Sequence, residues 1–241
     1  MFNHPHHQKI SFILDSLETE HFLKAGAFFG RGTLITLVYN EYRFSKDIDF
    51  ICPVGEGYRF FREIIVDASF DPAILFKPGV ALEFPREIGA DQYGIRFPVC
   101  SDDFIIKFEI VTEARIQLEA PDRFPWTELP CLSETDRFAE KLLANADRGL
   151  DSAIESRDLI DLAAMRVQTQ IPTLAIDKAE RAYPVIEPLK KSIANFHASK
   201  DYRNKCFDAL QITDRKMILD GLDLLAKDQG LPLFERTWQE E

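Results

Sequence analysis

The stretch "RFSKDIDFI", residues 43–51, places two acids at the start of a short apolar run. Side chains alternate between the two faces of a strand, so Asp47 and Asp49 are expected on one face and Ile48 and Phe50 on the other. Two neighbouring carboxylates repel each other, and a divalent cation is the usual partner of such a pair. The stretch therefore predicts a strand with a core face and a metal-binding acidic face, although a solvated turn is the alternative for the pair alone.

The residues upstream of the acids add a second feature. Gly30, Gly32 and Thr33 come immediately before or within an apolar, helix-like run that ends near residue 40. Glycines at a helix N-terminus let backbone N–H groups approach phosphate oxygens closely. We therefore expect a phosphate cradle just before the acid pair.

A third acid follows in "DFIIKFEIV", residues 103–111. Alternation places Lys107 and Glu109 on the same face as Ile105 and Val111, and charged groups are costly to bury without partners. One interpretation is an edge strand with a wet face. The other is that Glu109 joins Asp47 and Asp49 around two metal ions, which would activate an attacking oxygen and stabilise a leaving pyrophosphate.

Composition limits the class of protein. The chain has 241 residues and a net charge of −11, which argues against a broad nucleic-acid-binding face. Residues 189–207 hold five cations and one acid, a local excess of 5 − 1 = +4, typical of either a solvated helix face or a docking patch. We expect no membrane helix and no secretion signal, and the four scattered cysteines indicate reduced cytoplasmic thiols.

The pattern along the chain predicts two domains. Helices are expected at 8–18 and 57–67, and strands in "AILF", "GVALEF", "YGIRFPV" and "FIIKFEIV" between residues 72 and 118. Residues 120–132 resemble a connector, and only helical signals follow Ser133. The prediction is a catalytic domain at 1–130 and a helical domain at 131–241. His4, His6 and His7 are expected in a flexible terminal segment.

These motifs together resemble a known family. The segment "GRGTLITLVYNEYRFSKDIDF", residues 30–50, resembles the signature of the DNA polymerase beta-like nucleotidyltransferase superfamily. Within it, the segment is most similar to the AbiEii-type abortive-infection toxins, whose pattern is G-G-T, an apolar helix, then R-x-S-x-D-[IL]-D-F. Arg31 stands where the first glycine of G-G-T is expected. A later segment, residues 140–165, resembles the family's lysine helix followed by R-D-[LI]-x-D-L, with Lys141, Asp158 and Asp161 on the motif.

The resemblance implies a fold, a reaction and a set of residues. The fold would be α+β, a polymerase beta-like mixed sheet flanked by helices, with a C-terminal helical domain that completes the nucleotide cleft. The chain would transfer a nucleoside monophosphate from an NTP to a hydroxyl acceptor with two Mg²⁺ ions. The implied catalytic and metal-binding residues are Asp47, Asp49 and Glu109, with Glu109 also the candidate base, and the implied nucleotide-binding residues are Gly30, Gly32, Thr33, Ser45, Lys141 and Asp158.

The resemblance further implies a cytoplasmic toxin that acts on tRNA or another RNA and is counteracted by an antitoxin protein. Two alternatives stay open. The first is a nucleotidyltransferase with a small-molecule acceptor, as in the aminoglycoside-modifying enzymes. The second is a non-catalytic nucleotide-binding protein of the same fold. Residues 170–241 carry no motif that points to a function.

Overall fold

The computed structural model describes residues 2–234 and divides the chain into two compact units. The first unit comprises Met1–Leu37 and Ser45–Ser133, and the second comprises Val38–Phe44 and Glu134–Glu241. From Glu134 onward, shortly after the predicted boundary at residue 130, the chain belongs to the second unit. The segment Val38–Phe44, which the prediction assigned to the catalytic domain, belongs to the helical unit.

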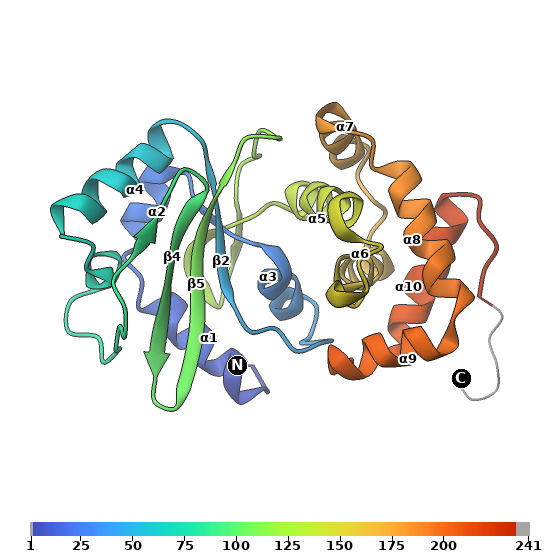
Figure 1. The fold of residues 1–241 in the computed structure, drawn as a ribbon, viewed down its shortest axis with the longest axis horizontal. Helices are drawn as coiled ribbons and strands as arrows, with labels where there is room; N and C mark the ends of the chain where they lie inside the picture. The colour runs from blue at the N-terminus through green and yellow to red at the C-terminus, as the bar shows by residue number, and fades with distance from the viewer. Residues whose placement is uncertain (1, 235–241) are drawn as a thin grey trace. The chain divides into compact units, whose positions relative to one another are not determined.

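The first unit is built on a seven-stranded sheet with the order β3-β4-β5-β2-β1-β7-β6. Figure 1 labels three neighbouring strands of this sheet, β4, β5 and β2. β2 pairs with β5 and β1 pairs with β7 in parallel, and the other neighbours are antiparallel. The predicted α+β fold with a mixed sheet is confirmed. The strands are β1 (Phe28–Phe29), β2 (Ile48–Pro53), β3 (Gly89–Ala90), β4 (Gly94–Ser101), β5 (Phe104–Glu113), β6 (Asp122–Phe124) and β7 (Thr127–Cys131).

β2 forms where the sequence predicted it, because every second side chain of the run is apolar. Ile48 and Phe50 are fully buried. The Phe50 ring lies 4.3 Å from the ring of Phe22 and 5.6 Å from that of Phe108, centroid to centroid. This aromatic packing holds one face of β2 in the core and leaves Asp49 on the opposite face.

Four helices accompany the sheet: α1 (Pro5–Asp15), α2 (Thr19–Ala25), α3 (Arg31–Val38) and α4 (Glu56–Asp67). α2 and α4 lie side by side in Figure 1, and α1 and α2 both contact β7. The helices predicted at 8–18 and 57–67 correspond to α1 and α4. Their apolar residues recur at helical spacing, and Ile10, Ile13, Leu14, Phe61 and Ile65 are buried.

Three secondary-structure predictions in the first unit are wrong. "AILF" is a 3₁₀ turn, η1 (Pro72–Leu75), because the Asp71 carboxylate accepts the Ala73 N–H at 2.9 Å and caps the turn. "GVALEF" forms only an isolated bridge between Glu83 and Cys100. The expected connector at 120–132 contains strands β6 and β7.

The second unit is helical over its described residues, as predicted. Gly221 of α10 (Arg215–Asp228) allows close contact with α6 (Arg157–Gln168), since a Cβ there would lie 2.2 Å from the Ala163 carbonyl oxygen. Within residues 2–234, none of the helices has both the length and the apolar character needed to cross a membrane. The helices of this unit are α5 (Glu134–Arg148), α6 (Arg157–Gln168), α7 (Thr173–Ala182), α8 (Ile186–Ala198), α9 (Lys200–Ala209) and α10 (Arg215–Asp228), with a short 3₁₀ turn, η2 (Ser152–Ile154).

Candidate active site

Two of the three predicted acids lie directly beside each other on the sheet. Parallel pairing of β2 with β5 places Asp49 in register with Glu109. Neighbouring strands are about 4.8 Å apart, so the two side chains project from adjacent positions on the same face. Both residues are only 9% exposed. Asp47, half-buried, lies just before β2 begins. We call Asp49 and Glu109 the acid pair.

Basic side chains surround the acid pair. Arg96 of β4, the antiparallel neighbour of Glu109, donates from Nε to Glu109 Oε1 at 3.0 Å, and Lys107 Nζ lies 2.9 Å from Glu109 Oε2. Arg31 Nη1 lies 3.5 Å from Asp49 Oδ1. Glu109 therefore has two close cations, whereas Asp49 has one at a longer distance.

The weaker pairing of Asp49 with cations is reflected in the pKa of its carboxyl. Burial raises the pKa of the Asp49 carboxyl to about 6, and the charges of Glu109 and Asp47 add to the rise against the opposing charges of Arg31 and Lys107. The positive charge around Asp49 thus only partly compensates its burial and its acidic neighbours. An additional cation close to Asp49 would stabilise its ionised form.

The donor set fits a hard divalent cation, because two neighbouring carboxylates on one face supply the oxygen ligands that Mg²⁺ prefers. Within the described residues, however, the structure assembles no group of three or more His, Cys, Asp or Glu side chains that could hold a metal ion. It brings Asp49 and Glu109 together without completing a site through Asp47. The predicted three-acid metal site stays a prediction.

The predicted phosphate cradle begins at the N-terminus of α3. The Gly30 N–H donates to the Asp49 carbonyl at 2.9 Å, and a Cβ on Gly30 would lie 2.5 Å from Leu132 Cδ1. Arg31 has φ of +59°, a conformation that glycine adopts without steric cost and other residues rarely adopt. The backbone geometry therefore explains why a glycine is expected at this position. Gly32 follows in the first turn of α3.

The hydroxyl groups of Thr33 and Ser45 form hydrogen bonds within the protein. The buried Thr33 hydroxyl donates to the Asp47 carbonyl at 2.6 Å and lies 2.7 Å from the Ser45 hydroxyl. These bonds fix the backbone that leads into β2. In the structure, both side chains hold the segment that carries Asp47, and their predicted contact with a nucleotide stays a prediction.

The histidines near the N-terminus also hold this segment, so the expectation of a flexible terminal segment is wrong. The His4 side chain caps α1. The buried His7 ring accepts the Ser45 N–H at Nε2, 3.2 Å away, and His6 Nε2 lies 2.9 Å from the Lys46 carbonyl. Sequence reasoning missed these residues because the bonds join positions about forty residues apart, and no local pattern signals them.

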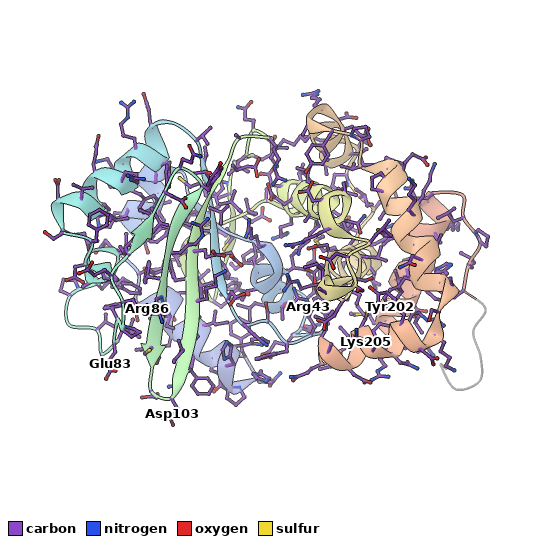
Figure 2. The ribbon with its side chains drawn as sticks, in the orientation of Figure 1. Arg43, Glu83, Arg86, Asp103, Tyr202 and Lys205 are labelled. Carbon is purple, nitrogen blue, oxygen red and sulfur yellow. The ribbon has the colours of Figure 1, made fainter. Side chains whose placement is uncertain are left out.

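The second motif forms a buried group of charges in the helical unit. Lys141 Nζ lies 2.7 Å from Asp158 Oδ1 and 2.6 Å from Asp161 Oδ2. Arg43 (labelled in Figure 2) pairs with Asp161 through Nε at 2.6 Å, and Arg148 Nε pairs with Asp158 at 2.7 Å. We call these five residues the ion cluster. All except Arg148 are at least nine-tenths buried.

The ion cluster has the opposite electrostatic character to the acid pair. Burial opposes ionisation of Asp158, but the charges of Lys141 and Arg148 outweigh it and hold the pKa of the carboxyl below its usual range. Burial likewise opposes ionisation of Asp161, and Arg43 and Lys141 together lower the pKa of that carboxyl. The structure therefore joins Lys141 and Asp158 to each other, whereas the acid pair belongs to the first unit.

Segment 189–207 exposes fewer cationic side chains than its charge count suggests. Arg203 is buried and donates to the carbonyls of Phe196 and His197. Lys190 pairs with Glu187 at 2.8 Å. Lys205 of α9 (labelled in Figure 2) and Lys191 of α8 are exposed. The segment thus offers few unpaired surface cations for nucleic acid.

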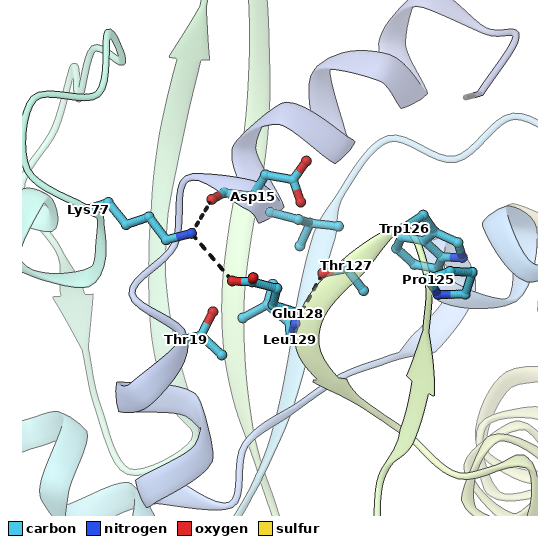
Figure 3. A pocket seen from close by; sticks show the side chains of 9 residues that line it. Asp15, Thr19, Lys77, Pro125, Trp126, Thr127, Glu128 and Leu129 are labelled. Atoms are coloured by element: carbon cyan, nitrogen blue, oxygen red, sulfur yellow. Dashed lines mark hydrogen bonds and ion pairs between the residues drawn. The ribbon is translucent and has the colours of Figure 1, made fainter.

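A cavity of about 390 Å³ in the first unit contains none of the predicted site residues (Figure 3). Figure 3 shows Lys77 directed at the Asp15 carbonyl, 2.9 Å away, and at the Glu128 carboxylate, 3.8 Å away. Trp126 lines this cavity and stacks on Phe124. The second tryptophan of the chain, Trp238, lies outside the described residues. The lining residues are Leu14, Asp15, Thr19, Lys77, Pro125, Trp126, Thr127, Glu128 and Leu129.

Comparison with known proteins bears on the family and on the fold. A family model described as nucleotidyl transferase AbiEii toxin, type IV toxin–antitoxin system, matches residues 13–210. No curated protein matches the sequence. A solved structure from H. pylori, assigned to the nucleotidyltransferases, is 17% identical to this chain, with a TM-score of 0.52. The match covers 93% of this chain and 95% of the H. pylori chain.

A second solved structure, JHP933 from Helicobacter pylori, is 16% identical with a TM-score of 0.50 and covers 95% of each chain. At these identities, the two structures support the fold alone. The family match extends over most of the chain and includes both motifs, the acid pair and the ion cluster. The chain belongs to the AbiEii nucleotidyl transferase toxin family of type IV toxin–antitoxin systems.

Proposed function

We propose that the chain transfers a nucleoside monophosphate from an NTP to a hydroxyl group of RNA, with release of pyrophosphate, in a reaction that requires Mg²⁺. The observation that carries the proposal is the register of β2 and β5, which sets Asp49 beside Glu109 on one face of the sheet. Asp49 is left with incomplete compensation of its charge, and Mg²⁺ is the cation that paired carboxylates favour. Membership of a nucleotidyltransferase toxin family supports the reaction class.

In this proposal Asp47, Asp49 and Glu109 would hold two Mg²⁺ ions. The ions would neutralise charge on the triphosphate and lower the pKa of the attacking hydroxyl. Glu109 would accept the proton of that hydroxyl. Thr33, Ser45 and His7 would keep the backbone at residues 45–47 in place, because their hydrogen bonds fix the segment that carries Asp47.

Lys141 would contact a phosphate of the nucleotide, and Asp158 would help to orient the nucleotide. An ammonium group has three donors, and Asp158 and Asp161 use two of them. The two carboxylates would hold the ammonium in a single position. One donor would then be directed at a phosphate oxygen.

The toxin family implies an antitoxin partner. We propose RNA as the acceptor and the cytoplasm as the place of reaction, where NTPs and RNA are both present. The net charge of −11 and the small number of exposed cations on segment 189–207 favour a short RNA footprint, such as a strand end, over a long duplex.

The test is to incubate the protein with each α-³²P-labelled NTP, Mg²⁺ and total RNA, and to resolve the products on a denaturing gel. We expect label on RNA from one or more NTPs, one pyrophosphate released per transfer, and loss of labelling in Asp49→Asn. Asp67→Asn, which changes an exposed acid at the end of α4, is the matched control and should label RNA normally.

The remaining outcomes separate the alternatives. Label that appears only on an added aminoglycoside would identify a small-molecule nucleotidyltransferase. Binding of a non-hydrolysable NTP without transfer to any acceptor would identify a nucleotide-binding protein without catalysis. Absence of NTP binding at millimolar Mg²⁺ would exclude both enzyme functions.

A further inference from the structure

Arg31 occupies a backbone position that disfavours any side chain. Its φ of +59° is in the left-handed region, which costs a non-glycine residue free energy. The contact that accompanies this conformation is the ion pair between Arg31 Nη1 and Asp49 Oδ1. Among the described residues, Arg31 is the cation that forms an ion pair with Asp49. Replacing it would leave that carboxylate beside Glu109 and Asp47 with the more distant charge of Lys107 as compensation.

The Arg31 side chain also lies where an incoming triphosphate is expected. It is 37% exposed, whereas the Asp49 side chain is 12% exposed. Arg31 lies between Gly30 and Gly32 at the N-terminus of α3, the segment proposed to cradle the phosphates. A guanidinium binds carboxylates and phosphates with the same fork of N–H donors, so one arginine can exchange one partner for the other.

We propose that Arg31 is a nucleotide-binding residue that pairs with Asp49 in the empty protein and with the triphosphate in the loaded one. Asp49 gives up the guanidinium when it ligates a divalent cation, and the released guanidinium then binds the phosphates. Arg31 therefore opposes cation binding in the absence of nucleotide and favours nucleotide binding once the cation is present. This inference rests on the proposed function and adds a residue to its nucleotide site.

The two roles predict opposite changes in two affinities, which can be measured without turnover. Mn²⁺ binding is followed by the electron paramagnetic resonance signal of the free ion. Binding of an α,β-methylene NTP is followed by calorimetry at saturating Mn²⁺. In Arg31→Ala and Arg31→Gly, we expect Mn²⁺ to bind about tenfold more tightly without nucleotide, and the analogue to bind about tenfold more weakly, than in the unmodified protein.

One comparison and two further variants make the result specific. Agreement between Arg31→Ala and Arg31→Gly separates loss of the guanidinium from relief of the backbone, because only glycine removes the conformational cost. Arg31→Lys keeps the charge without the fork, so it should restore Mn²⁺ affinity to normal but analogue affinity only in part. Arg59→Ala removes an exposed arginine from α4 of the same unit and should change neither affinity.

Two results would overturn the inference. One is that both affinities are unchanged in Arg31→Gly, and the other is that they change in the same direction. Failure of the proposed function looks different, since the unmodified protein would then bind neither Mn²⁺ nor any NTP analogue. If Arg31→Ala does not fold, Arg31→Gly and Arg31→Lys still give both readouts.

Discussion

Asp49 of the acid pair in the first unit and Asp161 of the ion cluster in the second are the same residue type in opposite electrostatic states. Asp49 has one cation at 3.5 Å and two acidic neighbours, and its pKa is raised to about 6. Asp161 has Arg43 and Lys141 at 2.6 Å, and its pKa is lowered. A carboxylate short of positive charge is suited to bind a cation from solution, whereas one paired with two buried cations is suited to hold helices together.

The largest expected effect tests the structural side of this comparison. Asp161→Asn leaves the Arg43 guanidinium buried without its charged partner, and removing one member of a buried pair costs about 3–5 kcal/mol of unfolding free energy. Urea unfolding at pH 7 measures it. Glu187→Gln, which removes an exposed pair with Lys190, is the control and should leave stability unchanged. A loss no larger than that of the control would contradict a structural role for the cluster.

The second effect tests the catalytic side. Asp49→Asn should lower the rate of nucleotidyl transfer roughly 10²–10³-fold, about 3–4 kcal/mol of transition-state stabilisation, because it removes a charge that would hold Mg²⁺. Unlike Asp161→Asn, it should not lower the free energy of unfolding measured in EDTA. Destabilisation comparable to that of Asp161→Asn would show that the two regions do not differ as described.

The pH dependence of stability should also have opposite signs in the two regions. The raised pKa of Asp49 means that the folded protein binds its proton more tightly than the unfolded chain, so stability from this group falls as pH rises from about 4 to about 6. At 1.36 kcal/mol per pKa unit the loss is about 3 kcal/mol. Asp158 has a lowered pKa, so its contribution is present above the usual aspartate pKa and is lost as pH falls.

The measurement is the unfolding free energy from pH 4 to pH 7 in EDTA, with each variant subtracted from the unmodified protein. The difference for Asp49→Asn should decrease with pH over this range. The difference for Asp158→Asn should increase as pH rises through the lower part of this pH range. Slopes of equal sign would refute the electrostatic contrast.

The smallest expected effect concerns the support of the acidic segment. Thr33→Val keeps the shape of the side chain but removes the hydrogen bonds to the Asp47 carbonyl and the Ser45 hydroxyl. Loss of these buried bonds should cost about 1–2 kcal/mol of stability. If Thr33 acts by positioning Asp47, kcat should fall while KM for NTP changes little. A rise in KM alone would instead indicate direct contact with the nucleotide.

The sequence predicted those features that depend on local periodicity. β2 and β5 follow from alternation, and α4 follows from helical spacing. Glu109 could therefore be proposed to join Asp47 and Asp49, with a wet edge strand as the alternative, but its place beside Asp49 became known only from the register of β2 and β5. The family signature added Lys141 and Asp158, which no pattern would have singled out as a pair. Their burial in an ion cluster, rather than exposure on a helix face, could not be predicted because it depends on Arg43 from a distant segment.

Where prediction failed, long-range pairing outweighed local signals. Pro125 and Pro130 suggested a connector, yet β7 forms because Cys131 pairs with Phe29 of β1 and the strand also pairs with β6. Conversely, "AILF" looked like a strand, but Pro72 and the Asp71 cap favour a turn. The bonds of His7 and Arg31 near β2 have no sequence signature, since each joins residues far apart in the chain.

The assignment of Val38–Phe44 to the helical unit has a consequence for dissecting the protein into fragments. A polypeptide that begins at Glu134 would include α5–α10 but not Arg43, so it would bury Asp161 with only one of its two cations. The Tyr42 carbonyl would likewise be missing as the acceptor of the Thr213 N–H. Autonomous folding of the C-terminal half would require residues 38–44 to be supplied as a separate peptide or joined by circular permutation.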